Sequence, residues 1–260
     1  MQNRTALITG ASSGIGLELA KCFAADGFRL ILTARTESAL RELATELSRQ
    51  YGAQAHVIVK DLSDYRQARE IFEETERQGL QVDYLVNNAG FGDFGLFHQS
   101  DWDKQERMIN LNITALTYLT RLYLPGMVAR RFGRVMNVAS TAAFQPGPFM
   151  SVYFATKAYV LHFTEAIANE LEGTGVSATA FCPGPTESAF AAAAAMQDSK
   201  TFKGQKLPDA RTVAQAGYKA LMRGAGAVYI PGWANRLLVF STRLAPRWVV
   251  AKIARRMLDK

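Results

Sequence analysis

The chain has 260 residues, of which 48% are hydrophobic and 20% charged, and its formal net charge is +7. This length suits one large α/β domain or two small ones, and the composition excludes disorder as the main state. The start of the chain lacks the pattern of a secretory signal, and no apolar run is long enough to cross a bilayer. We therefore expect a cytoplasmic protein in which Cys22 and Cys182 are reduced core residues.

Short apolar runs alternate with helical patterns along the chain. Strands are predicted at residues 5–8, 28–33, 55–59, 82–86, 134–138, 176–181 and 227–230. Helices are predicted at residues 14–25, 37–51, 65–78, 102–130, 152–171 and 210–222, the long fourth one interrupted only by Pro125. Almost wholly apolar strands separated by helices indicate an α/β fold with a doubly wound (Rossmann) parallel sheet of about seven strands, covered by helices on both faces. Because no linker divides the chain, we predict a single domain over residues 1–260.

A glycine-rich turn follows the first strand and opens the first helix. It reads Thr9-Gly10-Ala11-Ser12-Ser13-Gly14-Ile15-Gly16. Glycines allow a tight turn and a close approach of backbone to a pyrophosphate, and the N-terminus of the helix offers free N–H groups and the positive end of its dipole. The position of this turn predicts a dinucleotide-binding site.

The end of the second strand indicates which dinucleotide is bound. NAD sites have an acidic residue there for the ribose hydroxyls, whereas NADP sites have a cation for the 2′-phosphate. This chain has no acid at that point, and Arg35 is placed to reach a phosphate. NADP(H) is therefore favoured over NAD, the alternative being that Arg35 is a solvated residue at the start of a helix.

Further motifs occur in one order between about residues 5 and 190. They are the turn at 9–16, Asp61-Leu62, Asn87-Asn88-Ala89-Gly90, Asn110-Leu111, Ser140, Tyr153-Phe154-Ala155-Thr156-Lys157 and Pro183-Gly184. With this order and spacing, the chain resembles the short-chain dehydrogenase/reductase family of the single-domain type with a Tyr-x-x-x-Lys active site. The resemblance implies an oxidoreductase that interconverts a carbonyl and an alcohol with a nicotinamide cofactor, and a homodimer or homotetramer.

The resemblance also implies which residues hold the cofactor. Residues of the turn, Thr9, Gly10, Ser12, Ser13, Gly14, Ile15 and Gly16, would form the site of the phosphates and the adenosine ribose. Asp61 and Leu62 would flank the adenine, Asn88, Ala89 and Gly90 would border its ribose, and Asn87 would brace the sheet. Pro183, Gly184, Thr186 and Ser188 would hold the nicotinamide. Ser188 stands where the family usually has threonine, a mild departure because its hydroxyl could still bind a diphosphate or the carboxamide.

The predicted catalytic residues are Asn110, Ser140, Tyr153 and Lys157. Tyr153 and Lys157 are four apart in a helix and share a face, so the Lys157 ammonium and an oxidised nicotinamide would lower the Tyr153 pKa from about 10. Ser140 follows the fifth strand, where its hydroxyl can hold the substrate oxygen. In similar enzymes the lysine also binds the nicotinamide ribose, and the residue at Asn110 anchors a water on a proton relay. Asn112 is close by, which leaves the choice of Asn110 open.

Three segments are expected to set the substrate. Residues 91–97, residues 141–150 and a lid at about 187–207 are rich in Phe, Ala or Met and poor in charge, which predicts a hydrophobic substrate such as a steroid, an acyl or an aromatic ketone. The alternative function is a nucleotide-binding regulatory or scaffold protein on the same fold, which would not need Ser140, Tyr153 and Lys157 together. The scattered histidines predict no metal site.

The positive charge is concentrated at the end of the chain. Residues 236–260 contain seven basic residues and one acid, so this segment carries +6 and the rest only +1. The nearly neutral body disfavours nucleic-acid binding. Apolar residues are mixed with the basic ones over residues 233–260, a pattern that suits peripheral contact with an anionic membrane, a cover for the substrate pocket or a subunit interface.

Overall fold

The computed structural model describes residues 4–187, 190, 194, 196, 206–224 and 226–259. Ser188 and most of the predicted lid at 187–207 lie outside the described residues.

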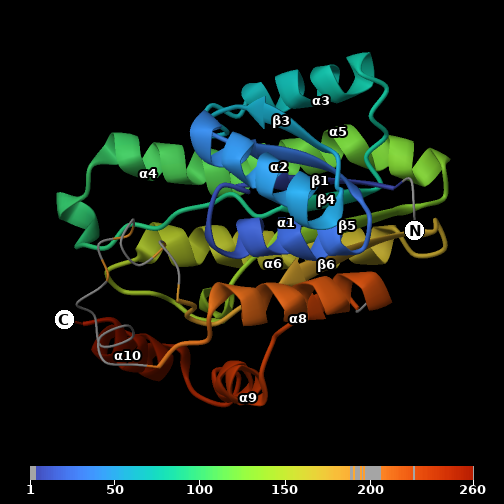
Figure 1. The fold of residues 1–260 in the computed structure, drawn as a ribbon. Coiled ribbons are helices and arrows are strands. Elements are labelled where there is room, and N and C mark those ends of the chain that lie inside the picture. Colours follow the sequence, from blue (N-terminus) through green and yellow to red (C-terminus); the bar gives the residue numbers. More distant parts are fainter. Residues whose placement is uncertain are drawn as a thin grey trace.

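Within these residues, seven strands form one parallel sheet in the order β3-β2-β1-β4-β5-β6-β7 (Figure 1). The strands are β1 (Thr5–Thr9), β2 (Arg29–Ala34), β3 (Ala55–Val59), β4 (Tyr84–Asn87), β5 (Gly133–Val138), β6 (Val176–Phe181) and β7 (Val228–Tyr229). The chain runs outward from β1 to β3 and then returns to place β4 on the other side of β1. This reversal confirms the predicted doubly wound sheet and places a crevice at the carboxyl ends of β1 and β4.

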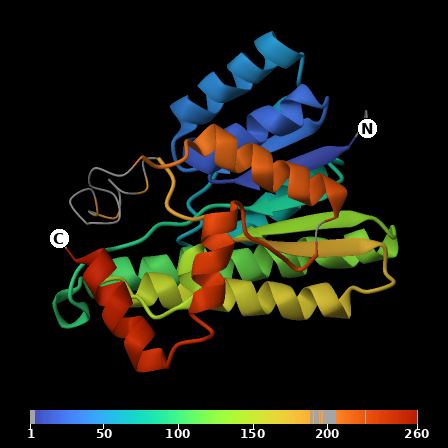
Figure 2. The ribbon, with the colours of Figure 1, turned by 90° about the horizontal axis from the view of Figure 1, so that it is seen from below.

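Helices cover both faces of the sheet, as Figure 2 shows from below. They are α1 (Gly14–Ala25), α2 (Glu37–Tyr51), α3 (Gln67–Arg77), α4 (Trp102–Ile109), α5 (Leu116–Ala129), α6 (Ser151–Glu170), α8 (Ala210–Arg223), α9 (Trp233–Ser241) and α10 (Arg247–Leu258). Alternate residues of a strand point to opposite faces. Accordingly, Ala6 and Ile8 of β1 pack with α1, α2 and α8, whereas Leu7 packs with α3, α5 and α6.

The predicted helix at 102–130 is irregular at a different place from the one expected. It runs through Pro125 without a break, but residues Asn110–Ala115 form a π-helix between α4 and α5. Asn112 in this segment is buried and hydrogen-bonds Thr156 of α6 and the backbone of Phe91. These partners are distant in sequence, so a local pattern does not reveal the irregularity.

A buried polar network ties the sheet to the helices beside the crevice. Asn87 and Asn137 lie opposite each other on β4 and β5, and the Asn87 side chain donates to Asn137 Oδ1 at 2.8 Å and to Thr120 Oγ1 of α5 at 3.0 Å. Asn137 in turn donates to Thr164 Oγ1 of α6 at 2.9 Å. The ends of β4 and β5 are thereby fixed relative to the two helices that flank the crevice.

Candidate active site

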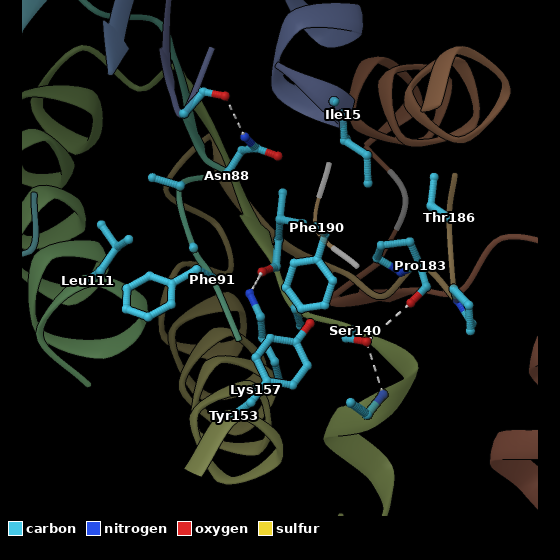
Figure 3. Close-up of a pocket in the computed structure, with 18 of the residues that line it drawn as sticks. Ile15, Asn88, Phe91, Leu111, Ser140, Tyr153, Lys157, Pro183, Thr186 and Phe190 are labelled. Carbon is cyan, nitrogen blue, oxygen red and sulfur yellow. Dashed lines mark hydrogen bonds between the residues drawn. The ribbon is translucent and has the colours of Figure 1, made fainter. Parts of the chain in front are cut away.

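A cavity of about 420 Å³ opens at the carboxyl ends of the strands (Figure 3). Its wall combines residues from the turn after β1, the ends of β2 to β5, helix α6, the segment after β6 and helices α9 and α10. The predicted site residues on this wall are Gly10, Ser12, Ser13, Gly14, Ile15, Arg35, Asp61, Leu62, Asn88, Ala89, Gly90, Ser140, Tyr153, Lys157, Pro183, Gly184 and Thr186. Thr9, Gly16 and Asn110 are not among the lining residues.

The glycine turn has a backbone that few other residues would tolerate. Gly10 has φ +66° and Gly14 has φ +56°, and a Cβ added to Gly10 would lie 2.9 Å from the Ala89 Cα. Ser13 caps α1 without a side-chain hydrogen bond, and the first turn of α1 has no acidic residue. The N-terminal N–H groups and the positive end of the helix dipole are thus suited to an anion such as a phosphate.

Thr9, Gly16 and Asn88 hold the backbone of this turn in place. The Thr9 Oγ1 accepts hydrogen bonds from the backbone N–H groups of Asn88 at 3.0 Å and Ala89 at 2.9 Å. The Asn88 side chain donates to the backbone oxygens of Thr9 and Gly10. A Cβ at Gly16 would lie 2.3 Å from the Gly10 oxygen, so only glycine lets α1 start this close to the turn.

Charged side chains of both signs gather at the end of the cavity near β2 and β3. Arg35 lines the cavity directly after β2, and Lys60, which the sequence reasoning missed, lines it directly after β3. The Lys60 Nζ is 2.5 Å from the Glu70 carboxylate. Burial raises the Asp61 pKa, but hydrogen bonds from Ser63 and the charges of Arg35 and Arg107 outweigh this, so the net pKa of Asp61 is lowered and its carboxylate stays ionised.

These residues fit a nicotinamide dinucleotide. The glycine turn leaves no room for side chains where a diphosphate would approach the backbone, and the cap of α1 has no acceptor of its own. Thr33, on the cavity wall, has a buried Oγ1 with no hydrogen-bond partner among the described residues. Buried polar atoms are normally paired, so this hydroxyl is consistent with a site built for a polar ligand. In the described part of the chain, no three His, Cys, Asp or Glu side chains are grouped to hold a metal.

Ser140, Tyr153 and Lys157 meet on the inner wall (Figure 3). The Ser140 Oγ hydrogen-bonds the Tyr153 hydroxyl, accepts from the Ala142 N–H at 3.1 Å and lies 3.4 Å from the Pro183 oxygen. The Lys157 Nζ donates to the Val138 oxygen at 2.7 Å and lies 5.8 Å from the centre of the Tyr153 ring. A proton-bearing phenol, a hydroxyl and an amine therefore surround one point of the cavity.

The expected lowering of the Tyr153 pKa is wrong for the protein by itself. Burial raises the pKa of Tyr153 to about 12, and the hydrogen bond with Ser140 offsets only part of this rise. The Lys157 amine is directed to the Val138 oxygen rather than to the phenol oxygen. Burial also lowers the pKa of Lys157, to about 8, while the neighbouring Cys182 acts in the opposite direction.

Asn110 and Asn112 occupy different environments. Asn110 begins the π-helix and is partly exposed, whereas Asn112 is buried and bonded to Phe91 and Thr156. All the polar groups of the Asn112 side chain are used in these structural contacts. The role of Asn110 in holding a water stays a prediction.

The other end of the cavity is apolar. Phe190 lies over Tyr153, with 5.2 Å between the ring centres. The remaining apolar lining residues at this end are Phe91, Met150, Phe154, Met196, Leu238, Ala254, Met257 and Leu258. The last four belong to α9 and α10, so the C-terminal segment contributes to the cavity wall, one of the three roles that its sequence left open.

Comparisons with known proteins agree with the fold. A family model described as short chain dehydrogenase matches residues 4–199. A short chain dehydrogenase of Pseudocercospora fijiensis is 37% identical over 194 residues, which cover 74% of this chain and 62% of that relative. The chain thus spans less than two thirds of that relative's length.

Solved structures resemble nearly the whole chain. A short-chain dehydrogenase from Sphingobium yanoikuyae in complex with NADPH is 31% identical with a TM-score of 0.83, and 93% of each chain is covered. A bulky-bulky ketone specific alcohol dehydrogenase from Comamonas testosteroni is 30% identical with a TM-score of 0.79, over 93% of this chain and 92% of that one. A relative from Burkholderia phymatum in complex with NAD is 25% identical with a TM-score of 0.81, over 92% of both chains.

The fold and the glycine turn define a dinucleotide-binding protein of the Rossmann type. Within that class, the chain belongs to the short chain dehydrogenase family, as its motifs predicted.

The lowered pKa of Lys157 predicts a pH-dependent contribution to stability. Below about pH 8 Lys157 holds its proton in both the folded and the unfolded chain, so burial of the charge lowers the free energy of unfolding by its full amount. Between about pH 8 and pH 10.5 the unfolded chain binds more protons than the folded chain, so the free energy of unfolding rises with pH. The free energy of unfolding of the wild type relative to Lys157→Met should rise by about 2 kcal/mol from about pH 7 to about pH 9.5.

Urea unfolding at the two pH values measures this difference. Lys219→Met, which removes an exposed lysine of α8, is the matched control and should show little change. An equal pH dependence for the two variants would contradict the assigned burial of the Lys157 charge.

Proposed function

We propose that this protein is an oxidoreductase that reduces an apolar ketone or aldehyde to an alcohol with NADPH. One observation carries the proposal: Ser140, Tyr153 and Lys157 lie on the wall of a single cavity that also includes Arg35 and the glycine turn on one side and apolar side chains on the other. In this proposal the dinucleotide binds on the side of Arg35 and the glycine turn, and the apolar substrate binds on the other side.

Each polar residue has a distinct task in this proposal. When bound, the reduced nicotinamide supplies the hydride that the carbonyl carbon receives. The Ser140 hydroxyl, fixed by Ala142 and Tyr153, holds the carbonyl oxygen and stabilises the negative charge that develops there. Tyr153 gives its phenolic proton to that oxygen, which completes the alcohol.

The pKa values indicate which protons the two side chains hold at neutral pH. With a pKa of about 12, Tyr153 keeps its proton at neutral pH and is ready to donate it. With a pKa of about 8, Lys157 is mostly an ammonium at pH 7, and its charge stabilises the phenolate that remains after the transfer. Asn110 would hold a water through which the proton is replaced.

Charge near β2 and β3 supports NADP(H) rather than NAD. Arg35 has a guanidinium suited to the 2′-phosphate, and Lys60, which is paired with Glu70, lies at the same end of the cavity. No acidic residue stands at the end of β2 to bind ribose hydroxyls. The relatives with bound NADPH and with bound NAD share this fold, so the choice depends on these side chains.

The substrate side of the cavity supports a hydrophobic substrate. Phe91, Phe154 and Phe190 line it together with methionines and residues of α10, and the relative from Comamonas testosteroni is specific for bulky ketones. Phe190 and Met196, two described residues from the predicted lid, line the cavity, and the proposed catalytic unit is a single domain over residues 1–260. A regulatory or scaffold protein would have no use for a phenol poised beside a serine.

Tyr153→Phe removes the proton donor and leaves the ring in place. We expect kcat for ketone reduction to fall by about 10²- to 10⁴-fold, with the affinity for NADPH retained. The decrease in absorbance as NADPH is oxidised measures kcat, and a fluorescence titration measures the affinity for NADPH. Tyr159→Phe, an exposed tyrosine of the same helix, is the matched control. Turnover that survives in Tyr153→Phe would overturn the assignment of Tyr153 as the proton donor, whereas a wild type that turns over no carbonyl compound would support the regulatory alternative.

Arg35→Asp replaces the proposed 2′-phosphate ligand by an acid. The ratio of kcat/KM for NADPH to that for NADH should fall by about 10- to 100-fold, the value of a charge-assisted hydrogen bond. Arg49→Asp makes the same charge change in the last turn of α2. If both variants keep the wild-type ratio, Arg35 is only a solvated residue.

A panel of carbonyl compounds tests the apolar pocket. Aromatic and steroid ketones should have a kcat/KM about tenfold or more above that of small sugars, because burial of each additional CH₂ contributes about 0.8 kcal/mol. Met257→Gln, at the cavity wall, should reduce this advantage several-fold, whereas Ile253→Gln, exposed on the same helix, should not. Good turnover of sugars beside poor turnover of apolar ketones would reject the substrate class.

A further inference from the structure

Helices α9 and α10 leave a group of large apolar side chains exposed. Trp233 is 78% exposed and Leu244 is 73% exposed. The other exposed members are Leu237, Leu238, Phe240, Trp248, Ile253 and Met257. Together they are eight of the fifteen large apolar residues that are exposed in the described chain, within only 25 positions. Such a concentration marks an interaction surface rather than scattered surface residues.

Both helices have one face toward the protein and one away from it. On α9, Trp233, Leu237 and Phe240 recur at helical spacing and are exposed, while Val239 is buried. On α10, Val250, Ala254 and Leu258 face inward at every fourth position. The exposed apolar residues are thus not required for packing of the helices against the protein.

The same surface is strongly basic. Between residues 233 and 258 the sequence has six basic residues, Arg236, Arg243, Arg247, Lys252, Arg255 and Arg256, and no acidic one. Lys252 is 5.0 Å from the exposed Trp248 ring, whereas Arg255 is 4.9 Å from the ring of Phe149 in the body of the protein. Basic and apolar residues also alternate along the sequence of this segment, so cations are interleaved with apolar groups.

We propose that the outward surface of α9 and α10 binds an anionic lipid bilayer, with both helices lying on it. An anionic bilayer offers negative headgroups for the arginines and an apolar layer beneath them for Trp233, Phe240 and Trp248. Tryptophan suits this boundary because its ring is apolar and its N–H is polar. No helix of the described residues is long and apolar enough to cross a membrane, so the contact is peripheral.

Charge favours a bilayer over a second copy of the chain. A symmetric dimer formed through this surface would place two segments of +6 against each other, which opposes association. The large exposed indole and aliphatic groups have no counterpart in a nucleic-acid contact made mainly of phosphates. An anionic bilayer has negative headgroups for the basic side chains and an apolar layer for the exposed apolar side chains.

The surface adjoins the cavity. Leu238 of α9 and Ala254, Met257 and Leu258 of α10 line it, so the helices that contact the bilayer also form a wall of the site. A consequence that rests on the proposed function is that an apolar ketone dissolved in the membrane would reach the cavity from this side. Lipid binding itself is measured without turnover, so it is tested separately from the reaction.

Vesicle flotation of the full chain tests the proposal. The protein should float with vesicles of phosphatidylcholine and phosphatidylglycerol, should float much less with phosphatidylcholine alone, and should be released as salt rises. Trp233→Ser/Phe240→Ser/Trp248→Ser and, separately, Arg243→Glu/Arg247→Glu should each lower the bound fraction by about tenfold or more. Circular dichroism and thermal unfolding establish that each variant is folded.

Matched controls lie elsewhere on the molecule. Arg69→Glu/Arg77→Glu makes the same charge change on α3, which Figure 1 places on the opposite side from α9 and α10, and Trp102→Ser removes an exposed tryptophan of α4. These variants should bind anionic vesicles like the wild type. Equal recovery with and without vesicles, or equal losses in the controls, would overturn the proposal. The proposal would also be overturned if the wild type did not bind vesicles but formed a dimer, and the triple serine variant were a monomer.

Discussion

The hydrogen bond from the buried Lys157 Nζ to the Val138 oxygen holds the candidate site together. Val138 ends β5 and Ser140 follows two residues later, while Tyr153 lies one helical turn before Lys157 on α6. Together with the Asn137–Thr164 hydrogen bond, this contact joins the end of β5 to α6 and so positions all three side chains relative to one another. Burying an amine is unfavourable unless a partner compensates, and the lowered pKa of Lys157 expresses that cost.

Another unfavourable feature is found at the same edge of the sheet. The buried oxygens Thr33 Oγ1 and Asn87 Oδ1 have no hydrogen-bond partner in the described structure. The faces of the sheet are packed in two apolar cores. Stability is thus supplied by the sheet and its helices, and these two unpaired polar atoms lie toward the edge where a ligand would be bound.

The C-terminal helices α9 and α10 have an inner face at the cavity and an exposed outer face. Their inner residues complete the apolar end of the cavity, and their outer residues expose tryptophan, leucine and arginine. They lie beyond residues 4–199, the part of the chain that the family model matches. The proposed substrate pocket and the proposed lipid surface therefore both involve a segment outside the part that the family model matches.

The sequence by itself determined the alternation of strands and helices, the glycine turn after β1 and the spacing of Tyr153 and Lys157, because these are local patterns of hydrophobicity, glycine and helical period. It also determined the family, since the motifs occur in order. Only the tertiary structure decided the π-helix at Asn110–Ala115, the presence of Lys60 in the cavity and the packing of α10 on its wall, because each depends on residues far apart in the chain. The same holds for the Tyr153 pKa. The spacing predicted that the Lys157 ammonium would lower it, but burial raises it instead, and the Lys157 amine donates to the Val138 oxygen.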